Sequence, residues 1–270
     1  FDGDKLKAWF KYQKTTPQFA DTYLEQADSL HYYFHSAGAV ALGVSTYSAL
    51  KEEEISIFKR FRNVFELAYR RYSDVELAKA QAREAQIEAA LEKVRSRTMG
   101  MQKSEDLKEV IQVVYDQLVH VDIHVEHAGF ITDYKANEDM HIWLADKHGA
   151  PSQITIPYFS SPHWNSFLDA REKGKDFFAN NLDFEEKNTF YQELFTHIPD
   201  LSEESKKFYF NCPGLAISTV LLDNIGLYIE NFEGTPYTEE ENEVLMRFGK
   251  VFQQTYTRFL DLQHAEAQAR

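Results

Sequence analysis

VFELAYRRYSDVELAKAQAR (Val64–Arg83) and VFQQTYTRFLDLQHAEAQAR (Val251–Arg270) are two versions of one segment. Ten of their twenty aligned positions are identical, at a constant offset of 187 residues. The match extends upstream, where Glu52–Phe65 aligns with Glu239–Phe252. Both upstream stretches begin with an acidic run, which suits the positive end of a helix dipole, and continue with apolar residues at helical spacing. The sequence therefore predicts the same amphipathic helix twice.

A strand-turn-strand pattern precedes each of these helices. His31–Val44 and Leu215–Ile229 each contain two apolar segments broken by a glycine, which is typical of two strands joined by a turn. A fixed period of this size indicates a tandem array, and we expect this chain to be a segment of a longer receptor. The predicted parts are the C-terminal part of a first module in 1–50, a connector helix in 51–103, a complete module in 104–237 and a second connector helix in 238–270.

The first connector contains no glycine or proline between Lys51 and Met99 and is rich in strong helix formers. As one helix, residues 52–99 would be about 70 Å long at roughly 1.5 Å per residue, too long for a single domain to bury. Its apolar residues follow two coiled-coil stripes that are out of phase near Val75–Leu77. We expect a parallel homodimer, and the alternative is a bent helix that folds back on its own domain. The predicted dimer-helix residues are Phe61, Phe65, Tyr72, Ile87, Leu91 and Val94.

The complete module continues after a break at Gly100, with Ser104 as the predicted N-cap of the next helix. Further expected elements are strands in 121–134, 139–146 and 152–159, a helix capped by Ser160 or Ser161, a strand in 175–180, and helices in 184–198 and 202–211. The final strand pair and helix close the module. This order predicts an antiparallel sheet with helices packed on it, an α+β fold.

Composition excludes several classes of protein. The 270 residues are 43% hydrophobic, so the chain as a whole is not disordered. A net charge of -14 without a Lys/Arg-rich block disfavours a nucleic-acid partner. The single cysteine, Cys212, excludes an intramolecular disulfide and fits a reducing compartment, so we expect a cytoplasmic location. No apolar run approaches the roughly 20 residues of a membrane span, and the N-terminus has no signal-peptide pattern.

The complete module resembles a GAF domain and, more narrowly, the GAF-like sensor modules that occur in tandem in Bacteroidetes signalling proteins. The segments that carry the resemblance are AQAREAQIEAALEKVRSRTMGMQKSEDLKEV, HAGFITDY, HIWLAD, PYFSSPHWNSF and FNCPGLAIS. It covers residues 76–270 and, as a half-copy, 1–75, although PAS domains share the general plan. The resemblance implies a GAF-like antiparallel sheet flanked by helices. It also implies a dimer that relays a signal to a C-terminal output domain, such as a histidine kinase of a two-component system, a phosphatase or a cyclase.

GAF pockets lie between the sheet and its covering helices, so the resemblance also implies a ligand site. The candidate lining residues are Phe130, Trp143, His163, Trp164, Phe167, Phe178, Tyr209 and Cys212. A pocket lined by these aromatic side chains would bind a flat or apolar small molecule. The alternative is that these side chains form part of the hydrophobic core and line no pocket. No cofactor is identified, because Pro213 follows Cys212 where bilin-binding GAF domains commonly have histidine. The Asn-Lys-Phe-Asp-Glu signature of cyclic-nucleotide-binding GAF domains is also missing from the sequence.

A group of polar residues alternates along the first predicted strand, with His127 directly after it. The group consists of His120, Asp122, His124 and Glu126. On a strand these side chains would share one face and could hold zinc or another divalent metal. We favour the solvated face of a half-buried strand, with the apolar residues between them pointing inward.

The favoured function is a non-enzymatic sensory and signal-relay segment of a cytoplasmic multidomain receptor. Its expected partners are a second copy of the chain, a C-terminal output domain and a small-molecule ligand. One alternative is a structural dimerisation spacer that binds no ligand. A weaker alternative is a metal-dependent enzyme that uses His120, His124 and Glu126.

Overall fold

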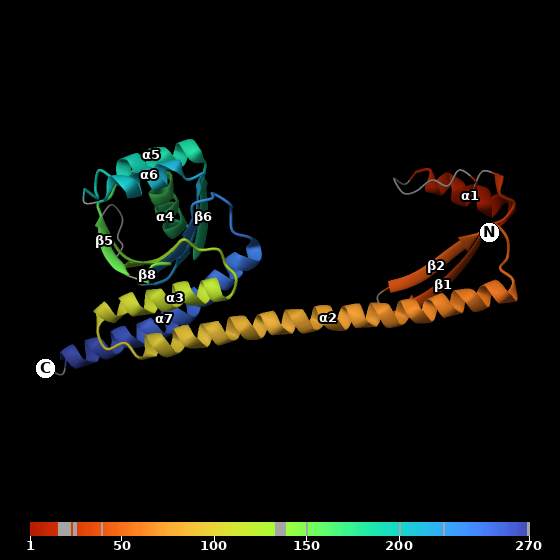
Figure 1. The fold of residues 1–270 in the computed structure, drawn as a ribbon, viewed down its shortest axis with the longest axis horizontal. Coiled ribbons are helices and arrows are strands. Elements are labelled where there is room, and N and C mark those ends of the chain that lie inside the picture. Colours follow the sequence, from red (N-terminus) through yellow and green to blue (C-terminus); the bar gives the residue numbers. More distant parts are fainter. Residues whose placement is uncertain are drawn as a thin grey trace. The chain divides into compact units, whose positions relative to one another are not determined.

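The computed structural model describes residues 1–15, 23, 26–38, 40–132, 139–149, 151–199, 201–223 and 225–268. They form two compact units, Phe1–Gln81 and Ala82–Arg270, which we treat separately. The helix α2 (Glu52–Met99) runs through the boundary between the units and has the bounds that the sequence predicts (Figure 1). Three glutamates form its first turn, and no helix-breaking residue interrupts it.

The first unit contains the N-terminal part of α2 and a hairpin. Its other elements are α1 (Gly3–Gln13), β1 (His31–Ala37) and β2 (Val40–Thr46). The two strands pair in antiparallel fashion, as the strand-turn-strand pattern predicts. Its small core is formed by Leu6 and Leu30, with Trp9 and Tyr32 packed against them.

The second unit is a six-stranded antiparallel sheet flanked by helices, so the predicted α+β fold is confirmed. The strand order is β5-β4-β3-β8-β7-β6. Its strands are β3 (His127–Thr132), β4 (Met140–Asp146), β5 (Ser152–Ile156), β6 (Phe177–Leu182), β7 (Leu215–Leu221) and β8 (Ile225–Asn231). Its helices, besides the C-terminal part of α2, are α3 (Leu107–His120), α4 (Pro162–Glu172), α5 (Phe184–Leu194), α6 (Glu203–Asn211) and α7 (Glu239–Gln268).

The sheet separates two cores. The C-terminal part of α2 lies with α3 and α7 on one face, and α4, α5 and α6 lie on the other (Figure 1). Residues of β7 alternate between the two faces: Val220 belongs to the first core, whereas Ile217 and Leu221 belong to the second. Because helices cover both faces, every residue of β7 is buried. Among the helices of the described ranges, none is both long and apolar enough to cross a membrane.

The second stripe of α2 is buried within its own unit. Ile87, Leu91 and Val94 are 3%, 3% and 0% exposed and cluster with residues of α3 and α7. Arg247 of α7 adds polar contacts by donating to Glu84 and Glu88 of α2, each at 2.6 Å. These three apolar side chains are therefore covered by their own module and are not open to a partner helix. Helical periodicity identifies an apolar face but does not say which neighbour covers it.

Two local predictions are wrong. The turn of 3₁₀ helix Ser104–Asp106 precedes α3, and Asp106, not Ser104, occupies the N-cap position. The Asp106 carboxylate instead accepts hydrogen bonds from the backbone N–H groups of Gln102 and Lys103, which lower its pKa. The first predicted strand also begins too early, because α3 continues to His120 and the strand starts at residue 127.

Replacing Leu91 with Ala is expected to lower the free energy of unfolding of the second unit by about 2–5 kcal/mol, since it opens a cavity in a packed core. The matched control is Leu77→Ala on the same helix, where the side chain is 59% exposed and the expected change is within about 0.5 kcal/mol. Urea unfolding followed by tryptophan fluorescence measures both. Equal effects of the two substitutions would contradict the burial of this stripe.

Candidate functional site

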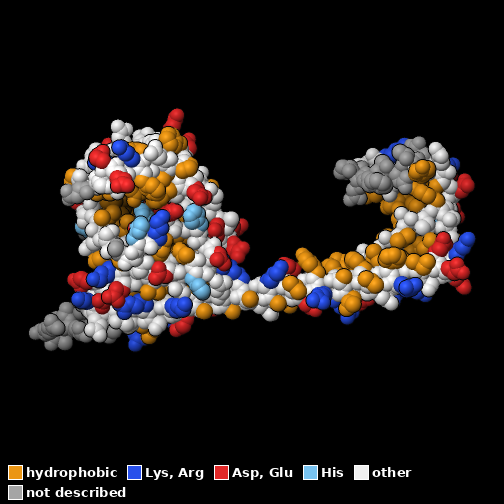
Figure 2. Space-filling view, viewed as in Figure 1, with side chains coloured by type: hydrophobic (Ala, Val, Ile, Leu, Met, Phe, Trp, Pro, Cys, Tyr) orange, Lys and Arg blue, Asp and Glu red, His pale blue; other side chains and the backbone are white. Residues whose placement is uncertain are grey.

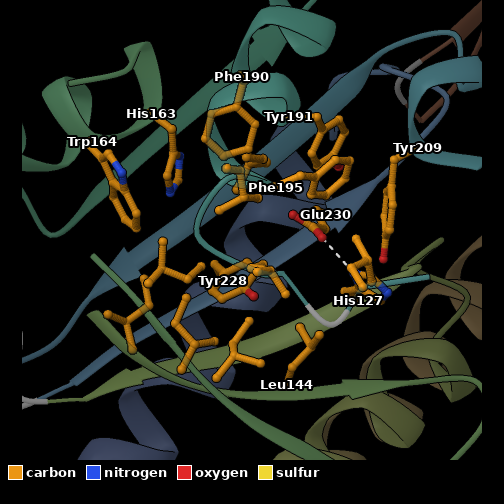
Figure 3. A pocket seen from close by; sticks show the side chains of 18 of the residues that line it. His127, Leu144, His163, Trp164, Phe190, Tyr191, Phe195, Tyr209, Tyr228 and Glu230 are labelled. Carbon is orange, nitrogen blue, oxygen red and sulfur yellow. Dashed lines mark hydrogen bonds and ion pairs between the residues drawn. The ribbon is translucent and has the colours of Figure 1, made fainter. Parts of the chain in front are cut away.

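A cavity of about 230 Å³ lies between the sheet and helices α4, α5 and α6. The sheet supplies one wall, mostly from aliphatic residues of β3, β4, β5 and β7, such as Ile131, Leu144 and Ile217. The opposite wall is aromatic and includes Trp164 from α4 and Phe190 from α5 (Figure 3). The cavity is thus largely apolar, with polar groups placed at two ends, as in small-molecule sites.

The floor of the cavity depends on one glycine. Gly129 of β3 pairs with Tyr228 of β8, and the tyrosine ring lies over the position that a side chain at 129 would occupy. A Cβ atom at Gly129 would be 2.2 Å from Cε1 of Tyr228, closer than real side chains come. The absence of a side chain at 129 therefore allows the Tyr228 ring to lie flat against the sheet and line the pocket.

His163 and Trp164 stand together at one end, at the start of α4 (Figure 3). Ser161 caps this helix, because its side chain accepts a hydrogen bond from the backbone N–H of Trp164. The sequence predicted either Ser160 or Ser161 as this cap. The His163 ring donates from Nδ1 to Oδ1 of Asn180 at 3.1 Å, and the Asn180 amide donates to Oγ of Ser166 at 2.8 Å. Burial lowers the pKa of His163, so its ring is neutral near pH 7.

The Trp164 indole adds a further feature to this end. Its Nε1–H is buried and has no hydrogen-bond partner in the part of the chain that the structure describes. An unpaired buried donor costs about 1–3 kcal/mol. Such groups are uncommon in cores, although Thr219 Oγ1 of β7 is another example among the described residues.

An ionisable pair lies at the other end of the cavity. His127 of β3 and Glu230 of β8 are cross-strand neighbours, and Nδ1 of the histidine lies 2.7 Å from Oε1 of the carboxylate (Figure 3). The ring of Tyr209 from α6 lies 6.3 Å from the His127 ring. His127 and Tyr209 also line a neighbouring, more polar hollow. This end therefore marks the boundary between the apolar cavity and a polar surface.

Helices α5 and α6 form the roof over this end. Asp183 and Glu186 form a capping box at the start of α5. Lys187 is fully buried, and its Nζ donates to the backbone carbonyls of Tyr209 and Phe210 at 2.6 and 3.1 Å, at the C-terminal end of α6. Burial lowers the pKa of Lys187. The carbonyls that this amine binds favour the cation, since they sit at the negative end of the α6 dipole.

Three phenols face the cavity as neutral groups. Burial raises the pKa of Tyr191, Tyr209 and Tyr228, and the charge of Glu230 acts in the same direction. The rings of Tyr191 and Tyr209 lie 5.0 Å apart, so the roof helices meet through aromatic contacts. No lysine or arginine is found among the described residues that line the cavity.

The structure brings together some predicted pocket residues and separates others. His163, Trp164 and Tyr209 line the cavity. Phe130 lies on the opposite face of the sheet, where it stacks on Phe252 of α7 at 4.2 Å, and Trp143 packs against the same core.

Three further candidates pack around the cavity without lining it. Phe167 and Phe178 meet edge-on at 5.9 Å, in the core beside His163. Cys212 is buried, its thiol donates to the Phe208 carbonyl oxygen, and burial raises its pKa.

Sequence reasoning missed the Glu230 end of the cavity. A glutamate two residues after Tyr228 in an otherwise apolar strand is the signal that could have pointed to it, because both residues face the same side.

The proposed metal cluster does not assemble. His120 ends α3, Asp122 has a positive φ of 56°, and residues 121–126 form no strand, so nothing aligns the four side chains on one face. Nε2 of the exposed His124 lies 3.5 Å from Oε1 of the half-buried Glu126. The apolar residues between them, Val121, Ile123 and Val125, are buried, as the favoured interpretation expects, although they do not lie on a strand.

No family model matches the sequence, and no curated protein matches it. Among solved structures, the chain is similar to the GAF domain from Acinetobacter phosphoenolpyruvate-protein phosphotransferase. That match has a TM-score of 0.36 and 9% identity over 63% of this chain and 93% of the other. The chain is also similar to the GAF domain from a phosphoenolpyruvate-protein phosphotransferase (ptsP) from Coxiella burnetii. Here the TM-score is 0.38 and the identity 11%, over 68% of this chain and 97% of the other.

The free energy of unfolding is expected to fall as pH falls below about 6.5, the ordinary pKa of histidine. Because the folded state holds His163 neutral, the unfolded chain binds more protons in this range. His163→Gln should reduce this pH dependence, whereas His148→Gln, which replaces an exposed histidine, should preserve it. Urea unfolding between pH 5 and 8 gives the slopes. An unchanged slope in His163→Gln would show that His163 is not held neutral.

Proposed function

We propose that the second unit is a non-catalytic sensory module that binds a small molecule between its sheet and helices α4–α6. In this proposal it belongs to a cytoplasmic multidomain receptor, as a GAF-like module. The observation that carries the proposal is a partly open, largely apolar cavity with a neutral histidine at one end and an ionisable pair at the other. A purely structural spacer has no need of such a cavity, because the side chains that line it forgo packing contacts with one another.

The sheet offers a physical route from the cavity to the long helices. On β3, Ile131 lines the cavity, while its neighbour Phe130 stacks on Phe252 of α7. On β8, Tyr228 lines the cavity, while Leu227 and Ile229 belong to the core shared with α2 and α7. A ligand that shifts these strands would change the packing of α7 and α2, which requires two arrangements of similar free energy.

The N-terminal part of α2 supports the proposed homodimer. An exposed apolar stripe, which we call the α2 stripe, runs along it (Figure 2). The α2 stripe consists of Ile57, Phe61, Val64, Leu67, Tyr72 and Val75. Phe61 is 68% exposed, whereas its repeat equivalent Phe248 in α7 is fully buried. Of the predicted dimer residues, Phe61 and Tyr72 are exposed and Phe65 is half-buried. We propose that a second copy of the chain covers the stripe in parallel orientation.

The division of the chain is part of the same proposal. Residues 1–50 are interpreted as the C-terminal part of a first module, and a C-terminal output domain of the full receptor would follow α7. The connector is assigned a double role, because the C-terminal part of α2 also belongs to the core of the second unit. A shift of that core would therefore act directly on the connector.

Ligand binding is tested by native mass spectrometry of the chain purified from cells and after incubation with a small-molecule library. We expect a non-covalent adduct that is lost in Leu144→Trp, since the new indole would fill the cavity. Gln153→Trp, on the exposed face of the neighbouring strand, should retain the adduct. The spacer alternative is favoured if neither source yields an adduct, or if both variants retain it.

Dimerisation is tested by sedimentation velocity over a range of concentrations. Phe61→Glu should raise the dimer dissociation constant by about 30-fold, as expected when roughly 2 kcal/mol of hot-spot energy is lost. Lys59→Glu, an exposed position on the opposite side of the helix, should leave it within about threefold. A monomeric wild-type chain, or equal effects of both substitutions, would contradict the parallel homodimer.

A further inference from the structure

The chemistry of the cavity narrows the class of ligand, if the second unit binds one as proposed. A cavity of about 150 Å³ lined by aliphatic and aromatic side chains is large enough for benzene. The cavity here measures about 230 Å³, so it accommodates one aromatic ring with a substituent or two fused rings. The aromatic roof and the floor, which consists of aliphatic side chains and the Tyr228 ring, fit a flat molecule, because both walls offer dispersion contacts to ring faces.

His163 presents a hydrogen-bond acceptor to this space. The Asn180 amide group donates to Ser166, so its carbonyl oxygen is the atom that faces the histidine and accepts from Nδ1–H. That bond fixes the tautomer of the ring, which leaves a lone pair on Nε2. Within the described ranges Nε2 has no hydrogen-bond partner, and it is not among the fully enclosed polar atoms. A ligand with an O–H or N–H group would satisfy it.

The charges around the cavity oppose an anionic ligand. Glu230 lines the wall and is paired with His127, whose Nδ1 is already engaged. The described lining offers no lysine or arginine to neutralise a carboxylate or phosphate. Burying such an anion beside Glu230 would cost desolvation that no lysine or arginine of the described lining offsets.

We propose that the cavity binds a neutral aromatic molecule of one or two rings that donates one hydrogen bond to Nε2 of His163. Phenols and indoles have this chemistry. The ring lies between the sheet and α4–α5, and its donor points toward the start of α4. Aromatic carboxylates and nucleotides fall outside the class.

Isothermal titration calorimetry of the full chain with indole and benzofuran tests the donor, because the two molecules have nearly the same shape and only indole has an N–H group. We expect indole to bind about tenfold more tightly than benzofuran, the effect of one buried hydrogen bond. Benzoate tests whether the cavity disfavours an anion, and it should bind more weakly than indole or benzofuran. This comparison uses the unaltered protein and does not depend on the folding of a variant.

Variants then assign the effect to a residue. His163→Phe should remove the preference for indole, whereas His197→Phe, which replaces a histidine stacked on Phe159 outside the cavity lining, should preserve it. Equal binding of indole and benzofuran, or preferred binding of benzoate, overturns the ligand class but leaves small-molecule sensing intact. An indole preference that persists in His163→Phe overturns the role of His163. Binding of none of the three compounds, together with no adduct in native mass spectrometry, overturns the sensing function as well.

Discussion

The structure of the second unit depends on the alternation of side chains along its central strands. β3 and β8 lie at the middle of the sheet, and each must fill two different cores at once. On β8, Leu227 and Ile229 pack toward the long helices, while Tyr228 and Glu230 face the cavity. A shift of one residue in the pairing would exchange these sets, so the register of β3 against β8 is fixed from both sides. The cavity exists because the second set does not fill its side of the sheet completely.

Local patterns predicted the order of elements well. Helix propensity, glycine and proline placement, and acidic first turns are properties of short segments, so the long α2, the hairpin β1–β2 and helices α4 to α7 could be predicted. The exceptions are places where competing signals overlap. Residues 121–126 alternate like a strand, yet α3 continues to His120 and the chain then turns at Asp122. Asp122 adopts a left-handed conformation there, which short polar residues tolerate.

The candidate site was less predictable, because its residues come from eight helices and strands. Phe130 and Ile131 are neighbours in sequence and lie on opposite faces of one strand. Sequence alone does not say which face the cavity occupies. His163, Trp164 and Tyr209 were found because helices near the sheet were expected to cover it. Glu230 was missed because its place at the cavity shows only in its contact with His127, which lies over 100 residues away in the chain.

Lys187 gives the roof of the cavity an unusual chemical property. Its amine is enclosed between α5 and α6 and held by the last carbonyls of α6. A primary amine in this position is shielded from reagents that acylate exposed lysines. Separation of the two helices would expose the amine to solvent. The rate at which Lys187 is acylated would therefore depend on how often α5 and α6 separate. A ligand that holds α5 and α6 together would therefore slow the acylation of Lys187.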